Sequence, residues 1–168
     1  MKRLLFAFLL TTVTMTLAAD SLTLKTLFKE MPDSIVPYLS MNNRLDFIDF
    51  MESKMKAEVT NSLGGKSLMT ALGEDSLSIR LNEACRLDIL LLTATQDVDS
   101  CRYIIAVIRT IGRDNDIQES EAPQYYSVNW KQLTVAPGLT EASRKRLQSC
   151  VKPTNILNFM TEKLNNTK

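Results

Sequence analysis

Three strongly apolar runs, joined by short polar connections, constrain the fold of this chain more than any other feature. In SLSIRLN (76–82) apolar residues alternate with polar ones, whereas RLDILLLT (86–93) and CRYIIAVIRTI (101–111) are almost continuously apolar. Alternation predicts a strand with one wet face, here an edge-like strand, and the continuous runs predict central strands. Because the connections are too short for crossover helices, the strands are expected to be antiparallel.

Two further segments extend the predicted sheet. QYYSVNW (124–130) reads as another strand, and KSLMTAL (66–72) is a less regular candidate before the first run. We therefore predict an antiparallel β-meander of about four strands over residues 66–133.

Helical spacing of apolar residues predicts helices before and after the sheet. A first helix is expected over 21–31, capped by Ser21 and ended by Pro32. A second starts between Ser40 and Asn43 and runs to about residue 61. Residues 140–151 and 154–164 show helical patterns as well.

These elements predict a fold of the α+β class. Residues 21–61 are helical, residues 66–133 form the meander, and 140–165 make a helical tail. The sheet is expected to pack one face on the 43–61 helix. About 150 residues follow the N-terminal leader, which is enough for one compact domain, here 20–168.

The N-terminus has the order of a secretory signal peptide. Lys2 and Arg3 precede an apolar run from residue 4 to 17, and Ala18 and Ala19 precede Asp20. The run is short for a bilayer-spanning helix, which needs about 20 apolar residues. We predict that residues 1–19 are a signal peptide cleaved near Ala18 to Asp20, which gives a soluble periplasmic or extracellular protein with no transmembrane segment.

Charge and composition exclude several classes of function. The chain holds 20 Lys and Arg against 19 Asp and Glu, and two of the basic residues lie in the leader, so the mature chain has no basic field to bind nucleic acid. It has no histidine, the commonest general base and metal ligand. We expect no catalytic residue, no metal site and no cofactor.

Two segments resemble ligand loops without matching them. GGKS at 64–67 has the end of a phosphate-binding loop, but Thr60 stands where that motif needs glycine. DNDIQESE at 114–121 starts like a calcium loop, but Glu119 takes the place of its glycine. We interpret the second segment as a solvated acidic loop.

The cysteine count is odd: Cys85, Cys101 and Cys150. If the hairpin folds about position 97, Cys101 lies opposite position 93 and Cys85 lies at the far end. At ~3.3 Å per residue, this separation exceeds what a disulfide spans. A disulfide, if one forms, is expected to join Cys150 to Cys85 or to Cys101.

The segment MNNRLDFIDFMESKM (41–55) carries the candidate acidic pair Asp46 and Asp49. On a helical wheel both acids face away from an apolar arc that includes Met55 and Val59, so a solvated helix face is the simpler interpretation. Phe50 also points away from that arc, and we interpret it as a contact either for the strands or for a ligand or partner.

Aromatic residues occupy both faces of the last predicted strand. Tyr126 and Trp130 alternate with Tyr125. They are candidates for a ligand or partner surface, although large aromatic side chains more often fill a core.

The order of MPDSIVPYL, NNRLDFIDF, the Ile/Leu-rich hairpin and YYSVNW resembles a family of secreted Bacteroidales proteins known only as a domain of unknown function. The resemblance runs from Leu27 to Leu133 and is most specific in an N-R-L-D-x-I-D-F stretch, here residues 43–50. It implies an envelope-facing protein and supplies no reaction. Because bacteria of that group glycosylate Asp-Ser-aliphatic triplets on exported proteins, the resemblance also makes Ser34 and Ser76 candidates for O-glycosylation.

Three hypotheses on function follow. The first is an exported, non-catalytic cell-envelope binding or assembly module for an unknown envelope protein or a hydrophobic small ligand. The second is an envelope hydrolase using Asp46 and Asp49, which requires the two carboxylates to face each other in a pocket about 5 to 10 Å apart. The third is a structural subunit of a larger assembly.

Overall fold

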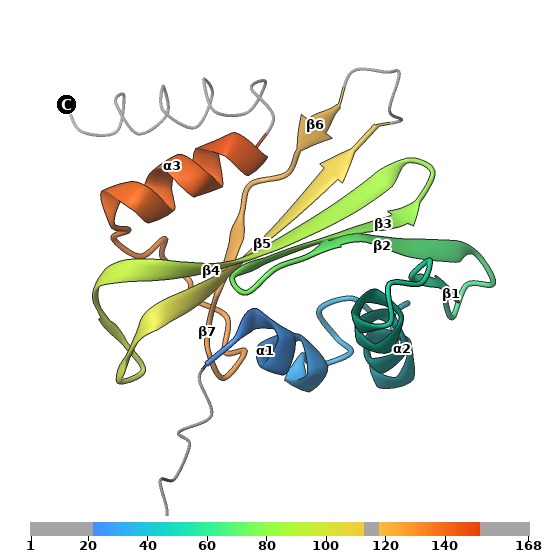
Figure 1. The fold of residues 1–168 in the computed structure, drawn as a ribbon. Coiled ribbons are helices and arrows are strands. Elements are labelled where there is room, and N and C mark those ends of the chain that lie inside the picture. Colours follow the sequence, from blue (N-terminus) through green and yellow to red (C-terminus); the bar gives the residue numbers. More distant parts are fainter. Residues whose placement is uncertain (1–21, 113–117, 152–168) are drawn as a thin grey trace, which may run out of the picture.

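The computed structural model describes residues 22–112 and 118–151, so the predicted signal peptide and the predicted 154–164 helix lie outside the described residues. Along the chain two helices come first, the strands of the sheet follow, and a third helix comes last (Figure 1). The elements are α1 (Leu24–Glu30), α2 (Met41–Glu52), β1 (Glu58–Thr60), β2 (Lys66–Leu72), β3 (Ser76–Asn82), β4 (Cys85–Val98), β5 (Cys101–Ile111), β6 (Glu119–Ser120), β7 (Gln124–Ser127) and α3 (Glu141–Cys150).

All pairings in the sheet are antiparallel. The strands follow the order β1-β2-β3-β4-β5-β6, and β7 also pairs with β5. The predicted α+β class with an antiparallel meander is therefore confirmed. In the described residues the sheet has seven strands rather than about four. Five of them, β2, β3, β4, β5 and β7, match the segments named from the sequence, and β1 and β6 are too short to leave a pattern there.

The alternating run 76–82 forms β3, but the prediction that β3 lies at an edge is wrong. It pairs with β2 on one side and with β4 on the other. Its alternate residues, Ser78 and Arg80, are polar because α3 packs on β4 and leaves this part of the sheet face uncovered. The alternation of apolar and polar residues in β3 thus indicates a strand with one incompletely covered face and not a strand at the edge of the sheet.

The β4-β5 hairpin is longer than predicted. Thr93 pairs with Tyr103 and Val98 with Cys101, so the turn lies at Asp99 and Ser100 rather than about position 97. Both turn residues have positive φ angles, 49° and 64°, which suit a tight hairpin turn and which short polar side chains tolerate better than bulky ones. Most of the polar segment TATQDVDS (93–100), which the sequence indicated as a linker between strands, therefore continues β4.

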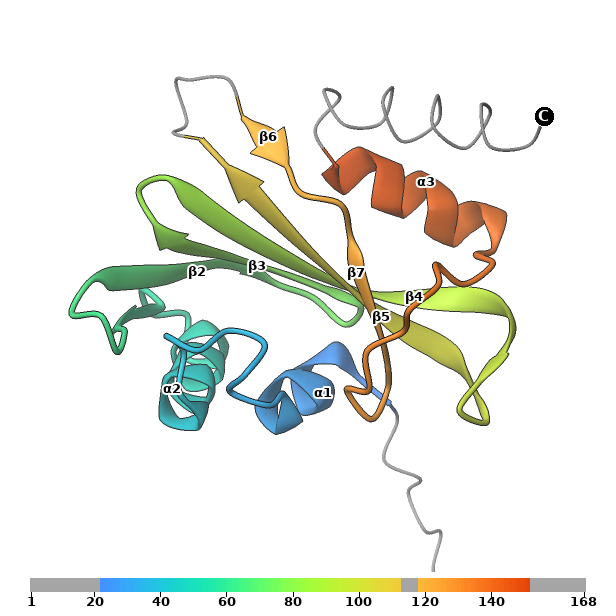
Figure 2. The same ribbon diagram turned by 180° about the vertical axis from the view of Figure 1, so that it is seen from behind.

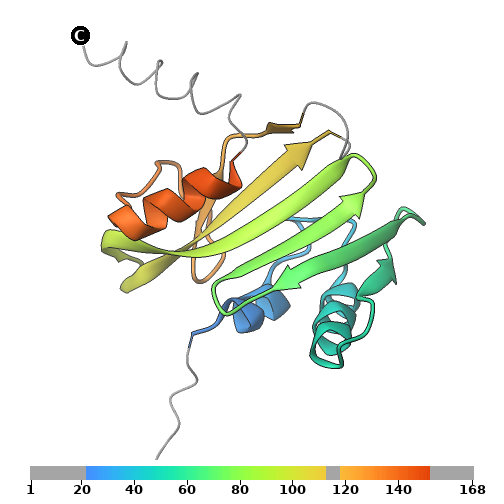
Figure 3. The ribbon, with the colours of Figure 1, turned by 45° about the horizontal axis from the view of Figure 1, so that its top comes forward.

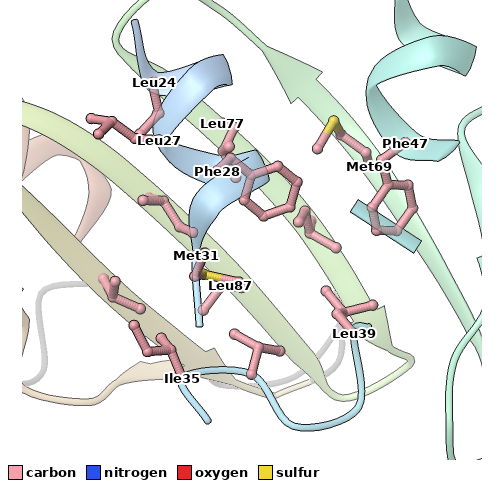
Figure 4. Close-up of a cluster of buried hydrophobic side chains, with 14 of the residues drawn as sticks. Leu24, Leu27, Phe28, Met31, Ile35, Leu39, Phe47, Met69, Leu77 and Leu87 are labelled. Carbon is pink, nitrogen blue, oxygen red and sulfur yellow. The ribbon is translucent and has the colours of Figure 1, made fainter. Parts of the chain in front are cut away.

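The two faces of the sheet carry separate hydrophobic clusters. α1, α2 and the linker between them lie on one face and α3 lies on the other, as Figures 2 and 3 show. Alternate residues of β4 and β5 enter the two clusters. Figure 4 shows the helical side chains that fill the first cluster. Its strand members include Leu87, Ile89, Leu91, Ile105 and Val107, and the second includes Leu90, Leu92, Ile104, Ala106 and Ile108.

This double coverage explains the continuous apolar runs. A strand buried on both faces needs apolar residues at every position, whereas a strand with one wet face needs them only at alternate positions. The second cluster is completed by Leu139 and by Leu147 of α3.

Helix α2 begins as predicted, with Ser40 as its N-cap in a reciprocal capping arrangement with Asn43. The prediction that it continues to residue 61 is wrong, because it ends at Glu52. Lys54 takes a positive φ of 55°, and the chain then extends into β1. Met55, which the helical wheel placed in the apolar arc, is 58% exposed.

Helix α1 begins at Leu24 with Thr23 as its N-cap, later than the predicted start at Ser21. The Thr23 hydroxyl accepts a hydrogen bond from the Thr26 backbone N–H at 3.2 Å. Helix α3 begins after the N-cap Thr140, within the predicted 140–151 range.

Arg44 of α2 ties this helix to the linker that follows α1. Its guanidinium donates from Nη1 to Asp33 Oδ1 at 2.6 Å and to the Leu39 carbonyl at 2.8 Å, and from Nη2 to the Met31 carbonyl at 2.6 Å. The Arg44 side chain is only 3% exposed, whereas that of Asp33 is 62% exposed. The buried arginine of the 43–50 stretch therefore contacts the linker and not the acids Asp46 and Asp49.

Asn61 organises the tight connection between β1 and β2. Its side-chain oxygen accepts from the backbone N–H groups of Leu63 (3.0 Å) and Gly65 (3.1 Å), and its amide nitrogen donates to Ser67 Oγ at 3.0 Å. The residue is buried. We expect Asn61→Ala to lower the free energy of unfolding by about 2–3 kcal/mol, because these donors and acceptors lose their partner.

Urea unfolding followed by circular dichroism measures this loss. The matched control is Asn82→Ala, because Asn82 accepts one comparable bond from the Ala84 N–H in an exposed turn. We expect the control to cost less than about 1 kcal/mol. Equal losses in the two variants would contradict a special role for the Asn61 network.

Candidate functional site

A pocket lies between the linker after α1 and the β5-β7 side of the sheet. Its volume is about 530 Å³. Three segments that are far apart in the sequence line it: Pro32, Ser34 and Ile35 of the linker, Arg109 of β5, and Gln124, Tyr126, Trp130 and Gln132 of β7 and the chain after it.

The linker forms one wall because it cannot be a continuous helix. Prolines at 32 and 37 interrupt it, and single turns form instead, with Ile35 N–H bonded to the Pro32 carbonyl at 3.1 Å. Ile35, Val36 and Leu39 are buried against the sheet and anchor the linker, as Figure 4 shows for Ile35 and Leu39. Ser34 directly precedes these anchors in the chain and is exposed.

Trp130 forms another wall through an unusual backbone conformation. Its φ of 60° lies in the left-handed region, which costs a residue other than glycine about 1–3 kcal/mol. The turn is closed by a bond from Trp130 N–H to the Ser127 carbonyl at 2.9 Å. This turn lets the indole Nε1–H donate to the Leu27 carbonyl of α1 at 2.8 Å.

Tyr126 and Trp130 pack against each other with ring centroids 5.8 Å apart and planes tilted by 56°. Both residues are buried, so little of either ring is open to the pocket. Stacking of a sugar ring on these aromatics is therefore not favoured by the geometry. They act as rigid walls that hold the polar lining in place.

Among the described residues that line the pocket, Arg109 is the one that carries a charge. Its Nη2 donates to the Ile35 carbonyl at 2.6 Å, and its Nη1 lies 3.9 Å from Glu121 Oε2. Tyr126 Oη donates to Gln124 Oε1 at 3.0 Å, which leaves the Gln124 amide nitrogen as a donor. In the part of the chain that the structure describes, the lining thus offers several donors, one positive charge and no carboxylate.

Tyr38 and Cys85 lie next to Arg109. Burial raises the pKa of the Tyr38 hydroxyl, Cys85 adds to the rise, and Arg109 opposes it. Burial also raises the pKa of the Cys85 thiol, against an opposing effect of Arg109. Both groups are therefore held in their neutral, protonated forms at neutral pH.

The raised pKa of Cys85 predicts slow alkylation. The thiolate is the reactive form, and a higher pKa leaves less of it at a mildly alkaline pH. We expect iodoacetamide to modify Cys85 more slowly in the folded chain than in the chain unfolded in urea, as measured by mass spectrometry of the peptides. Equal rates in the two states would contradict this assignment.

The structure brings some of the sequence-predicted site residues together. Tyr126 and Trp130 line the pocket, and Ser34 lies at the same pocket. Tyr125 belongs to the opposite face, where it packs against the α3-side cluster. Phe50, predicted to face outward, is half-buried against the cluster beneath α1 and α2.

The remaining candidates lie elsewhere. Asp46 and Asp49 are exposed on α2 and do not line the pocket. Ser76, the first residue of β3, is partly exposed. All three cysteines are free, and Cys85 and Cys101 belong to the strands β4 and β5.

Sequence reasoning missed Arg109, Gln124 and Gln132. One signal was available for Arg109, which interrupts an otherwise apolar strand and faces the side that α1 and the linker cover. A charged residue at such a position needs a polar environment. The two glutamines carry no comparable signal in the sequence.

The described ranges 22–112 and 118–151 contain neither a candidate metal site nor a candidate membrane-spanning helix. No three Cys, Asp or Glu side chains in that part of the chain come close enough to hold a metal ion. None of its helices has the length and apolar character needed to cross a membrane.

Comparison with known proteins gives a family and one structural neighbour. A family model described as "Protein of unknown function (DUF3256)" matches residues 16–166. The chain matches no curated protein sequence. A solved structure titled "Structure of a domain of an uncharacterized protein from Porphyromonas gingivalis W83" is 21% identical with a TM-score of 0.49, covering 67% of this chain and 54% of that chain. This chain therefore spans little more than half the length of that neighbour.

Proposed function

Because the chain belongs to the DUF3256 family of proteins of unknown function, we propose a function from its own residues: it is an exported, non-catalytic binding module of the cell envelope. The observation that carries this proposal is the pocket between the linker and the β5-β7 side of the sheet. Its volume is within the range of sites for small ligands. Rigid aromatic walls and a few polar groups are the usual composition of such a site.

The proposed export rests on the N-terminal sequence. A basic pair, an apolar run and two alanines before Asp20 are typical of a signal peptide. N-terminal sequencing of the mature protein tests it, with a new terminus near residues 18–20 as the expected result. A mature protein that begins at Met1 would contradict export by this route.

The absence of histidine and the position of the acidic pair support a non-catalytic role. Asp46 and Asp49 project from α2 into solvent, whereas acid-base hydrolysis needs two carboxylates facing one pocket. The 43–50 segment, the most specific part of the family resemblance, contributes the buried residues Arg44, Phe47 and Ile48. We propose that its role is to dock α2 and the linker.

The lining favours a polar ligand over the hydrophobic one expected from sequence. The apolar side chains on both sheet faces are already packed in two clusters, and the pocket instead presents an arginine, two glutamines and a serine. An envelope protein that inserts a polar side chain into the pocket fits the same lining.

Native mass spectrometry of the protein purified from the envelope of cells that make it tests this proposal. Ser34→Trp fills the pocket from the linker, and Ser53→Trp, at the exposed end of α2, is the matched control. We expect a species bound to the natural chain and to the control but not to Ser34→Trp. A species retained equally by both variants would contradict the pocket, and no bound species in any sample would contradict a binding module.

A further inference from the structure

We propose that the ligand of this pocket carries an anionic group, a carboxylate or a phosphate, which binds the guanidinium of Arg109. This inference rests on the proposed binding function. The lining residues within 22–112 and 118–151 include one cation and no carboxylate, so an anion is the charge that they favour.

Arg109 is held in position for this role. The bond from Nη2 to the Ile35 carbonyl fixes the plane of the guanidinium, and its side chain is 23% exposed. The Tyr38 hydroxyl also bonds the guanidinium. A planar guanidinium held in this way presents its remaining N–H groups to a ligand with little loss of conformational freedom.

Glu121 is the group that an incoming anion would displace. Its backbone N–H donates to the Arg109 carbonyl at 2.8 Å, so Glu121, the residue directly after β6, lies beside Arg109 of β5. Its carboxylate lies 3.9 Å from Nη1, which is longer than a hydrogen bond, and it is 46% exposed. Such an exposed pair is weak, so a ligand anion that reaches hydrogen-bond distance competes with it.

The remaining lining residues recognise the rest of the ligand. A pocket of about 530 Å³ is much larger than an isolated phosphate. Gln124, with its amide nitrogen available, Gln132 and Ser34 supply neutral donors and acceptors around the cation. We infer a small polar organic acid or phosphate ester rather than an inorganic ion.

Ligand-observed NMR with the full mature chain tests the inference without knowledge of the natural ligand. The probes are pairs that share a skeleton and differ in charge: glucuronate and glucose 6-phosphate against glucose, and benzoate against benzamide. We expect the acids to bind and their neutral counterparts to bind at least several-fold more weakly. Inorganic phosphate, which carries the charge without an organic skeleton, shows whether charge alone is enough for binding.

Two variants assign the effect to Arg109. Arg109→Gln is expected to weaken binding of the acids roughly tenfold to a hundredfold, because a charge-assisted hydrogen bond is lost. Glu121→Gln removes the competing carboxylate and is expected to strengthen it roughly two- to fivefold. A purely structural role of Arg109 does not predict the second result, and Glu121→Gln leaves the Ile35 anchor in place.

The outcomes separate this inference from the proposed function. Equal binding of acids and neutral counterparts, unaffected by both variants, would overturn the anion inference and leave the binding module. Absence of acid binding, together with a Ser34-sensitive species in native mass spectrometry, would overturn it in the same way. Loss of both signals would overturn the two proposals together.

Discussion

Replacing Arg44 by Met is expected to lower the free energy of unfolding by about 3–4 kcal/mol. The methionine fills much of the space of the arginine but leaves the carbonyls of Met31 and Leu39 without the donor that they share. Arg44→Lys keeps the charge, yet an ammonium cannot reproduce the fork that reaches all three acceptors, so we expect a loss of about 1–3 kcal/mol. Urea unfolding followed by circular dichroism measures both.

Asp33→Asn is the control that identifies the source of the effect. The Asp33 carboxylate is largely exposed, so its ion pair with Arg44 is screened by water and contributes below about 1 kcal/mol. A loss from Asp33→Asn as large as that from Arg44→Met would show that the ion pair, and not the carbonyls, stabilises the linker. High salt should change neither value much if the carbonyls dominate.

Replacing Trp130 by Ala is expected to cost about 3–5 kcal/mol, because a large buried side chain is removed and its partner ring loses a neighbour. Trp130→Phe keeps much of the packing and loses the hydrogen bond to the Leu27 carbonyl, for which we expect about 1–2 kcal/mol. Circular dichroism is the required probe, since Trp130 is the single tryptophan of the chain.

The matched control for Trp130 is Tyr103→Ala. Tyr103 is an aromatic residue near the end of the β4-β5 hairpin and is 44% exposed. We expect less than about 1 kcal/mol from this change, because little buried surface is lost. Similar losses of unfolding free energy at the two positions would contradict the assignment of Trp130 as the anchor between α1 and the turn that follows β7.

The sequence predicted the sheet well because hydrophobic periodicity reports burial directly. Runs 66–72, 76–82 and 101–111 coincide with β2, β3 and β5. The end of α2 was missed for a specific reason. Met55 and Val59 continue the helical spacing, and the left-handed conformation that ends the helix is adopted by Lys54 and not by a glycine, which would have indicated it in the sequence. Val59 is buried, but it belongs to the strand β1 and not to the helix α2.

The candidate site was less predictable than the fold. Its residues come from the linker, from the end of β5, and from β7 and the chain that follows it. No local motif joins positions 34, 109 and 132. Tyr126 and Trp130 were identified as aromatics with a role, but their burial shows that they shape the pocket more than they contact what enters it. Only the pairing of β5 with β7 brings Arg109 to the same pocket.

The borders of the sheet have a consequence for how this domain behaves at high concentration. β1 has three residues and carries Glu58, paired with Lys56 and Lys66, while β6 has two residues and is followed closely by Pro123. The outer side of β7 is occupied by the chain around Gln132. Short strands, lysines and proline are the devices that prevent strands of different molecules from pairing. These borders therefore keep the long apolar strands β4 and β5 from pairing with strands of other molecules and starting aggregation at high concentration.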